Sequence, residues 1–274
     1  MSPILGHLLI LWAVVAVVLV VLHTVHRKRR PFTGLRYAGI FGFVGASFGV
    51  IIGMTTFFAS QHYSSVQQAA EREATAVGEI AALSGAFRQR EGAQIRAQLY
   101  CYASDVITDE WPRNTSRGSP AVEGRERALY VLMLGVGRGN PKPANWYSAA
   151  VNSGLTLGQQ RQDRLVASSP QVPVPLWMLL YAGAALVVVF AFFFHLEGRG
   201  QLFGMTLAVI LVLSAVVAVL AGLDSPTEGP FGQKPDGMTA VRAGLAKDLP
   251  LAARDAKSFC AKLPFPPGEP SALL

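Results

Sequence analysis

The sequence predicts an all-α membrane protein with four transmembrane helices and a helical extramembrane domain between spans two and three. Three observations support this prediction. Apolar residues make up 51% of the 274 positions, which is high for a soluble domain. These residues are concentrated in four long runs that contain no Asp, Glu, Lys or Arg. Between the second and third runs, apolar and polar positions alternate with the three- and four-residue spacing of amphipathic helices.

The four runs are long enough to span a bilayer, since a helix needs about 20 apolar residues to cross a hydrocarbon layer of roughly 30 Å. The first run is followed by "HRKRR" and not by a small-residue cleavage site, so we expect an uncleaved span and not a signal peptide. The spans are predicted at residues 1–25, 37–60, 172–194 and 201–223.

A basic cluster in the loop of residues 26–36 predicts the orientation of the chain. The cluster comprises Arg27, Lys28, Arg29 and Arg30. By the positive-inside rule it is cytoplasmic and meets anionic lipid headgroups, which places both termini and the 61–171 domain on the outer face of the membrane. Most of the net charge of +7 lies in this cluster, so the charge does not indicate nucleic-acid binding.

The 61–171 domain is predicted to consist of helices. The second span runs on past the membrane, with small or apolar positions from Tyr63 to Phe87 forming a packing seam and Gly92 ending the helix. A second amphipathic helix ends at Trp111-Pro112, because a proline disfavours helical backbone in the residue before it. We expect a loop over 113–127 and helices over 128–136 and 145–168.

The sequence indicates no enzyme, metal site or cofactor. No nucleophile-elbow, P-loop or dinucleotide-binding motif occurs, and His62 is the only histidine between the second and third spans. Adjacent helical residues point about 100° apart, so Asp109 and Glu110 would not converge on one substrate atom. We interpret both as solvated acids at a helix end. The span interiors lack charged residues, which argues against a pump or ion-coupled carrier.

The second span carries a glycine face, made by Gly39, Gly42, Gly45, Gly49 and Gly53. Glycines at this spacing let another helix backbone approach closely in lipid. Two interpretations stay open: packing within the chain, or a face at a subunit interface or along a pore.

Two cysteines, Cys101 and Cys260, fall on the same side of the membrane because two spans separate them. They either form a disulfide or remain two unrelated thiols. Residues 224–274 are predicted to be a polar, partly disordered tail with one helix near 238–247.

Taken in order, the second span and its extension, the "YCYASDVITDEWPR" segment, the "RQDRLVASS" entry to the third span and "LDSPTEGPFG" after the fourth resemble the bestrophin-like family of bacterial membrane proteins. The positions that match the family pattern are Glu73, Asp109, Glu110, Trp111, Pro112, Arg161, Arg164, Asp224 and Pro226. The sequence departs from that pattern after Asp224, where Thr227 stands in place of a phenylalanine.

The resemblance implies four spans with a helical domain between the second and third. Likeness to bestrophins further implies a ring-shaped homo-oligomer whose second span lines an anion pore. The leading functional hypothesis is therefore an anion-permeable channel embedded in the lipid bilayer. The alternative is a non-conducting scaffold or sensor whose extramembrane helices bind a partner protein.

Overall fold

The computed structural model describes residues 3–26, 38–113, 117–136, 144–169, 172–193, 199–225, 232–249 and 256–263. Throughout this part of the chain the regular elements are helices. The chain divides into two compact units: unit 1 comprises residues 1–64 and 170–232, and unit 2 comprises 65–169 and 233–274. The basic cluster Arg27–Arg30, Pro226 and the end of the tail lie outside the described residues.

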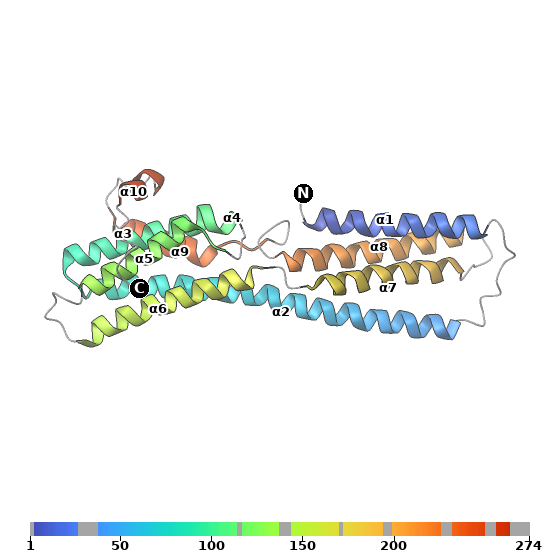
Figure 1. Ribbon diagram of the computed structural model, residues 1–274, viewed down its shortest axis with the longest axis horizontal. Helices are drawn as coiled ribbons and strands as arrows, with labels where there is room; N and C mark the ends of the chain where they lie inside the picture. Colours follow the sequence, from blue (N-terminus) through green and yellow to red (C-terminus); the bar gives the residue numbers. More distant parts are fainter. Residues whose placement is uncertain are drawn as a thin grey trace, which may run out of the picture. The chain divides into compact units, whose positions relative to one another are not determined.

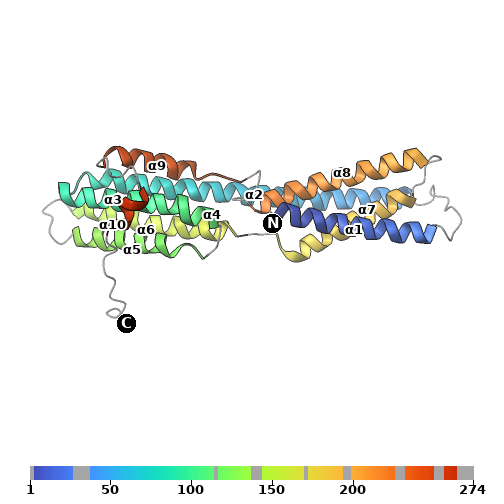
Figure 2. The same cartoon turned by 90° about the horizontal axis from the view of Figure 1, so that it is seen from above.

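Unit 1 contains the apolar helices: α1 (Pro3–His26), the first part of α2 (Ala38–Ser84), α7 (Val174–Phe193) and α8 (Arg199–Asp224). Helices α1, α7 and α8 pack against one another (Figures 1 and 2). Helix α2 joins this group through Phe48, whose ring lies on Gly183 of α7. A Cβ on Gly183 would lie 2.2 Å from that ring, so only glycine leaves room for it.

Three described helices are long and apolar enough to span a membrane: α1, α2 and α8. The apolar part of α7, Val174–Phe190, is shorter. The structure therefore confirms the all-helical class over the described residues and gives three candidate membrane-spanning helices, and the fourth span remains a prediction.

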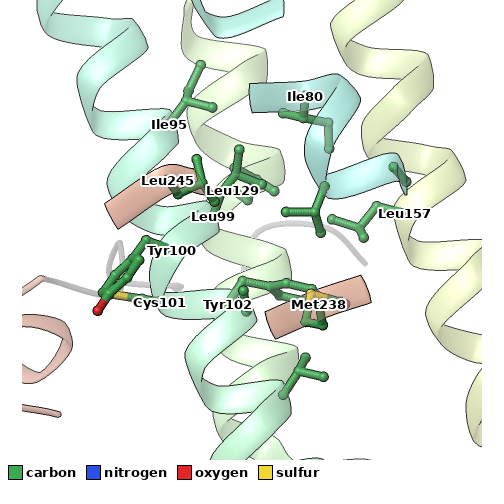
Figure 3. Close-up of a cluster of buried hydrophobic side chains, with 14 of the residues drawn as sticks. Ile80, Ile95, Leu99, Tyr100, Cys101, Tyr102, Leu129, Leu157, Met238 and Leu245 are labelled. Carbon is green, nitrogen blue, oxygen red and sulfur yellow. The ribbon is translucent and has the colours of Figure 1, made fainter. Parts of the chain in front are cut away.

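Unit 2 is built from the second part of α2 with α3 (Gln89–Asp105), the π-helical turn η2 (Val106–Glu110), α4 (Trp111–Arg113), α5 (Pro120–Val136) and α6 (Ala144–Ala167). Two helices of the C-terminal segment, α9 (Asp236–Lys247) and α10 (Ala256–Lys262), pack on α3. Figure 3 shows the core of this unit, where Ile95, Leu99 and Tyr102 of α3 meet Met238 and Leu245 of α9.

The predicted packing seam of the second span is confirmed. Val66, Ala74, Val77 and Ile80 are buried, whereas Gln67, Gln68, Glu71, Arg72 and Glu79 on the other face are exposed. Ile95, Leu99, Tyr102 and Val106 of the next helix are also buried as predicted. The helix predicted near 238–247 corresponds to α9.

Three predicted boundaries are wrong. Helix α2 ends at Ser84 and not at Gly92, which instead lies inside α3, where its missing side chain admits the carbonyl oxygen of Ser84. The stretch interpreted as loop over 113–127 contains the start of α5, because Ser119 caps the helix and Pro120 occupies its first position. The helix at Trp111-Pro112 continues to Arg113, since the η2 turn shifts its hydrogen bonds before the proline.

Candidate functional site

Four buried charged residues of unit 2, Glu73, Glu110, Arg161 and Arg164, form an ion network with Glu126 that connects α2, the η2–α4 turn, α5 and α6. Its centre is Arg164 of α6, which donates to both Glu73 of α2 and Glu110 of η2. Arg161, one turn earlier on α6, donates to Glu110 over 2.6 Å and to Glu126 of α5 over 2.8 Å. Four segments that are distant in sequence are therefore joined by charge-assisted hydrogen bonds.

The two central carboxylates have their hydrogen-bonding capacity filled by the protein. Glu73 is fully buried and also accepts a bond of 2.7 Å from the Tyr102 hydroxyl. Glu110 is 3% exposed and also accepts a bond of 2.7 Å from the backbone N–H of Ser119. Because donors from several elements already occupy these oxygens, the arrangement acts as a structural tie and offers no carboxylate poised to attack or to take a proton from a substrate.

The electrostatics of the network favour its charged form. Burial by itself would raise the pKa of Glu110, but the hydrogen bonds from Arg161, the charge of Arg164 and the Ser119 N–H outweigh it and lower that pKa. Burial would lower the pKa values of Arg161 and Arg164, yet the neighbouring carboxylates raise both. Burial, followed by the charge of Glu73, raises the pKa of Tyr102 well above its ordinary value, so this hydroxyl remains a donor.

Trp111 and Gly118 pack directly against members of the network. The Trp111 ring lies 5.7 Å from the Arg164 guanidinium carbon, and its indole N–H donates to the Gln233 carbonyl over 3.0 Å. Gly118 has a positive φ of 68°, and a Cβ there would lie 2.7 Å from Arg161 Nη2 and 3.1 Å from Glu110 Oε2. Glycine is therefore required at this position both by backbone conformation and by space.

A small pocket of about 50 Å³ borders the network. It is lined by Glu73, Trp111 and Arg164 together with residues 233–238, which lead into α9. Its size suits a small number of water molecules. Among the described residues, no group of three His, Cys, Asp or Glu side chains is arranged to hold a metal ion.

The interpretation of Asp109 and Glu110 as solvated acids is wrong for Glu110, which is buried and paired with two arginines. Asp109 is partly exposed, with bonds from the Ser119 hydroxyl and from Arg113. Trp111 packs back as predicted, whereas Pro112 is exposed. Asp224 lies apart from the network, in unit 1, where its buried carboxylate accepts the Val172 N–H over 2.9 Å.

The glycine face of α2 has no packing partner in the described part of the chain. Gly42, Gly49 and Gly53 are exposed and Gly45 is half-buried, and a Cβ added to any of the four would meet no atom within 4 Å. Gly39 belongs to the same helix. Large apolar side chains flank the glycines on the exposed side, among them Phe43, Val50, Met54 and Phe57.

Some members of the site had no assigned role in the sequence. Tyr102 was expected only as a core residue, and Ser119 and Glu126 fell in the stretch interpreted as loop. The signal for the last two is the Ser119-Pro120 pair, which starts a helix and places Glu126 on the face towards α6.

The fold and the site together define an all-helical membrane protein whose second apolar helix extends into a helical unit held by a buried ion network. The sequence profile of the bestrophin-like domain matches residues 7–238, and the chain therefore belongs to the bestrophin-like family. No curated protein sequence matches it.

Solved structures of bacterial membrane proteins share this fold. A variant of a bacterial bestrophin homologue from Klebsiella pneumoniae aligns with a TM-score of 0.63 at 11% identity, over 89% of this chain and 100% of the other. A second variant of that homologue aligns with a TM-score of 0.62 at 11% identity, over 90% and 98%. A structure described as a membrane protein aligns with a TM-score of 0.66 at 9% identity, over 89% and 97%.

Glu73 and Glu110, two of the positions that match the family pattern, thus lie at the centre of the buried network. The pH dependence of its stability follows from the shift at Glu110.

Lowering the pH is expected to weaken unit 2 through Glu110. The pKa of this group is lower in the folded chain than the value of about 4.3 in an unfolded chain, so its contribution is complete above about pH 5 and lost as the pH falls through the folded pKa. The urea concentration at the midpoint of unfolding should therefore decrease as the pH is lowered from 6 to 3, a range that brackets the unfolded pKa. Tryptophan fluorescence of the full chain in detergent measures this midpoint.

The Glu110→Gln variant should be less stable at neutral pH and should show a shallower fall of the midpoint with pH. Asp105→Asn is the matched control. The pKa of Asp105 is raised, mainly by burial, so protonation of Asp105 adds stability as the pH falls, which is opposite to the effect of Glu110. An equal slope in the wild type and in Glu110→Gln would contradict the assignment.

Proposed function

We propose that the chain assembles with copies of itself in a bacterial plasma membrane and forms an anion-permeable channel, with the glycine face of α2 at the subunit interface or along the pore. The observation that carries this proposal is that, among the described residues, no atom lies within 4 Å of a Cβ built on Gly42, Gly45, Gly49 or Gly53. A glycine within a helix costs about 1 kcal/mol relative to alanine. Four such positions on one face, with no close packing against the part of the chain that the structure describes, favour a role between chains.

The chemistry of this face is compatible with ion passage. Residues 38–60 of α2 contain no Asp, Glu, Lys or Arg, and aromatic and aliphatic side chains flank the glycines. A neutral, apolar constriction of this kind gates channels by dewetting. The cluster Arg27–Arg30 would raise the local concentration of small anions at the cytoplasmic end of the spans. The bacterial bestrophin homologues that share the fold support the same direction.

We place unit 2 and both termini on the outer face, with α7 as a fourth span. The basic cluster supports this orientation through the positive-inside rule. The disulfide between Cys101 and Cys260 supports it independently, because structural disulfides persist in oxidising compartments and are rare in the cytosol.

A second candidate function is a non-conducting scaffold or sensor whose helices in unit 2 bind a partner protein. It is favoured by exposed apolar side chains on α5 and α6: Val131, Leu134, Trp146 and Leu155. In that case changes on the glycine face would matter little, whereas charge changes at Glu71, Arg72 or Glu79 would alter binding.

Cross-linking through an introduced cysteine tests the interchain role of the glycine face. Both native cysteines are held in the disulfide, so Gly49→Cys adds the one free thiol of the chain. Under mild oxidation in native membranes, we expect a dimer band for Gly49→Cys on a non-reducing gel. Val212→Cys, on an exposed position of α8, is the matched control and should stay monomeric. A monomeric Gly49→Cys, or equal cross-linking of both variants, would contradict the proposal.

A further inference from the structure

The last described helix, α10, is packed on unit 2 although it is too short to be stable by itself. It has seven residues, and an isolated helix of this length is unstable in water. Nevertheless Cys260 is buried, and Phe259 and Leu263 pack against the core of the unit. Specific contacts to α3 and α5 must therefore hold it in place.

The first contact is covalent. Cys101 of α3 and Cys260 of α10 form a disulfide across a sequence separation of 159 residues, with Cα atoms 5.5 Å apart. Beside it, the rings of Tyr100 and Phe259 meet edge to face with centroids 6.0 Å apart. Figure 3 shows Tyr100 and Cys101 together on α3 at the edge of the core cluster.

The second contact is a buried arginine that caps the end of α10. Arg125 of α5 donates to the Cys260 carbonyl over 2.5 Å and to the Leu263 carbonyl over 3.4 Å. The last carbonyls of a helix have no intrahelical partner. A cation at this end is also attracted by the partial negative charge of the helix dipole. The same guanidinium donates to Asp105 and Gln98, so it keeps partners within unit 2 if α10 leaves.

We propose that α10 is a redox-controlled strap: the Cys101–Cys260 disulfide fastens it over Tyr100 and Arg125, and reduction of the disulfide releases it. The inference rests on the proposed location of unit 2 in an oxidising compartment, and it goes beyond channel function. Its partner is a protein of the dithiol–disulfide exchange class, which recognises the two cysteines as substrate.

The exchange balances without a further reactant. On closure, the two thiols lose two electrons and two protons in total to the disulfide of the exchange protein, which becomes a dithiol. On release, a thiolate of the reduced exchange protein attacks Cys260 Sγ, the Cys101 thiolate leaves, and a second thiol of that protein resolves the mixed disulfide. Cys101 is fully buried and Cys260 is 4% exposed, so attack requires α10 to lift first. Such local opening is expected of a helix of only seven residues.

Hydrogen exchange on the full-length protein in detergent tests the strap. Reducing the wild type with a phosphine reductant should lower the protection of the α10 amides by at least about tenfold, because only the Arg125 hydrogen bonds and the non-covalent packing of Phe259 and Leu263 then hold the helix. The α9 amides are the internal control and should keep their protection, since α9 packs through Met238 and Leu245 and has no disulfide. The Cys101→Ser/Cys260→Ser double variant should exchange like the reduced wild type and should not respond to reductant.

The redox state in cells is measured on protein whose free thiols are blocked in intact cells before extraction. A small maleimide first blocks the free thiols, and the protein is then reduced and treated with a polymer-linked maleimide. We expect two polymer labels per chain, one on each cysteine of the disulfide. Capture of two free thiols by the first reagent would overturn the strap together with the outer-face location, whereas the chloride flux described below tests the channel separately. Unchanged α10 protection after complete reduction, or a disulfide ladder between chains, would overturn the strap alone.

Discussion

Arg164→Met is expected to destabilise unit 2 by about 3–5 kcal/mol, the range measured when one partner of a buried ion pair is removed. The substitution retains most of the side-chain volume and removes the charge that lies between two carboxylates. Glu73, which is fully buried, would keep only the Tyr102 hydroxyl, while Glu110 would keep Arg161 and the Ser119 N–H. Urea unfolding in detergent at pH 7 measures the loss.

Two matched variants make this prediction specific. Arg127→Met removes the surface pair with Glu123, whose side chains are 70% and 59% exposed, and should cost no more than about 1 kcal/mol. The Glu73→Gln/Arg164→Met double variant should be less destabilised than the sum of its single variants, because removing both charges leaves no unpaired ion between those two positions. Equal losses for Arg164→Met and Arg127→Met would show that the network does not stabilise the unit.

The sequence predicted the packing of unit 2 better than its polar site. Burial along α2 and α3 follows from helical periodicity, which depends on residues three and four positions apart, so Val77 and Leu99 could be assigned to the core. The fate of Glu110 depends on Arg161, 51 residues away, and on a turn containing Gly118. Local pattern carries no information on such a contact.

Asp109 and Glu110 illustrate the difference in a single pair. Adjacent helical residues point in directions about 100° apart, which argues against shared acid–base chemistry. The same geometry sends one carboxylate into the network and leaves the other partly exposed beside Arg113. The sequence therefore indicated that the two acids differ in direction, whereas only the arrangement of α6 reveals which one is buried.

The glycine face presents the reverse situation. Its spacing could be predicted from sequence, and two interpretations remained open because glycines serve packing both within and between chains. The described part of the chain supplies no intrachain neighbour for Gly42, Gly45, Gly49 or Gly53. Replacement of these glycines should therefore leave the fold of the single chain intact, which makes them suitable probes of assembly and conduction.

Chloride efflux from liposomes containing the purified protein tests the channel most directly. We expect flux from the wild type and its loss, by at least about tenfold, in the Gly45→Leu/Gly49→Leu variant, since two isobutyl side chains on this face would block a narrow pore or separate the subunits. Gly204→Leu on α8 is the matched control, because a Cβ there also meets no atom within 4 Å, and it should conduct like the wild type. A folded, oligomeric wild type that passes no chloride, or a double variant that conducts normally, would contradict a pore along α2.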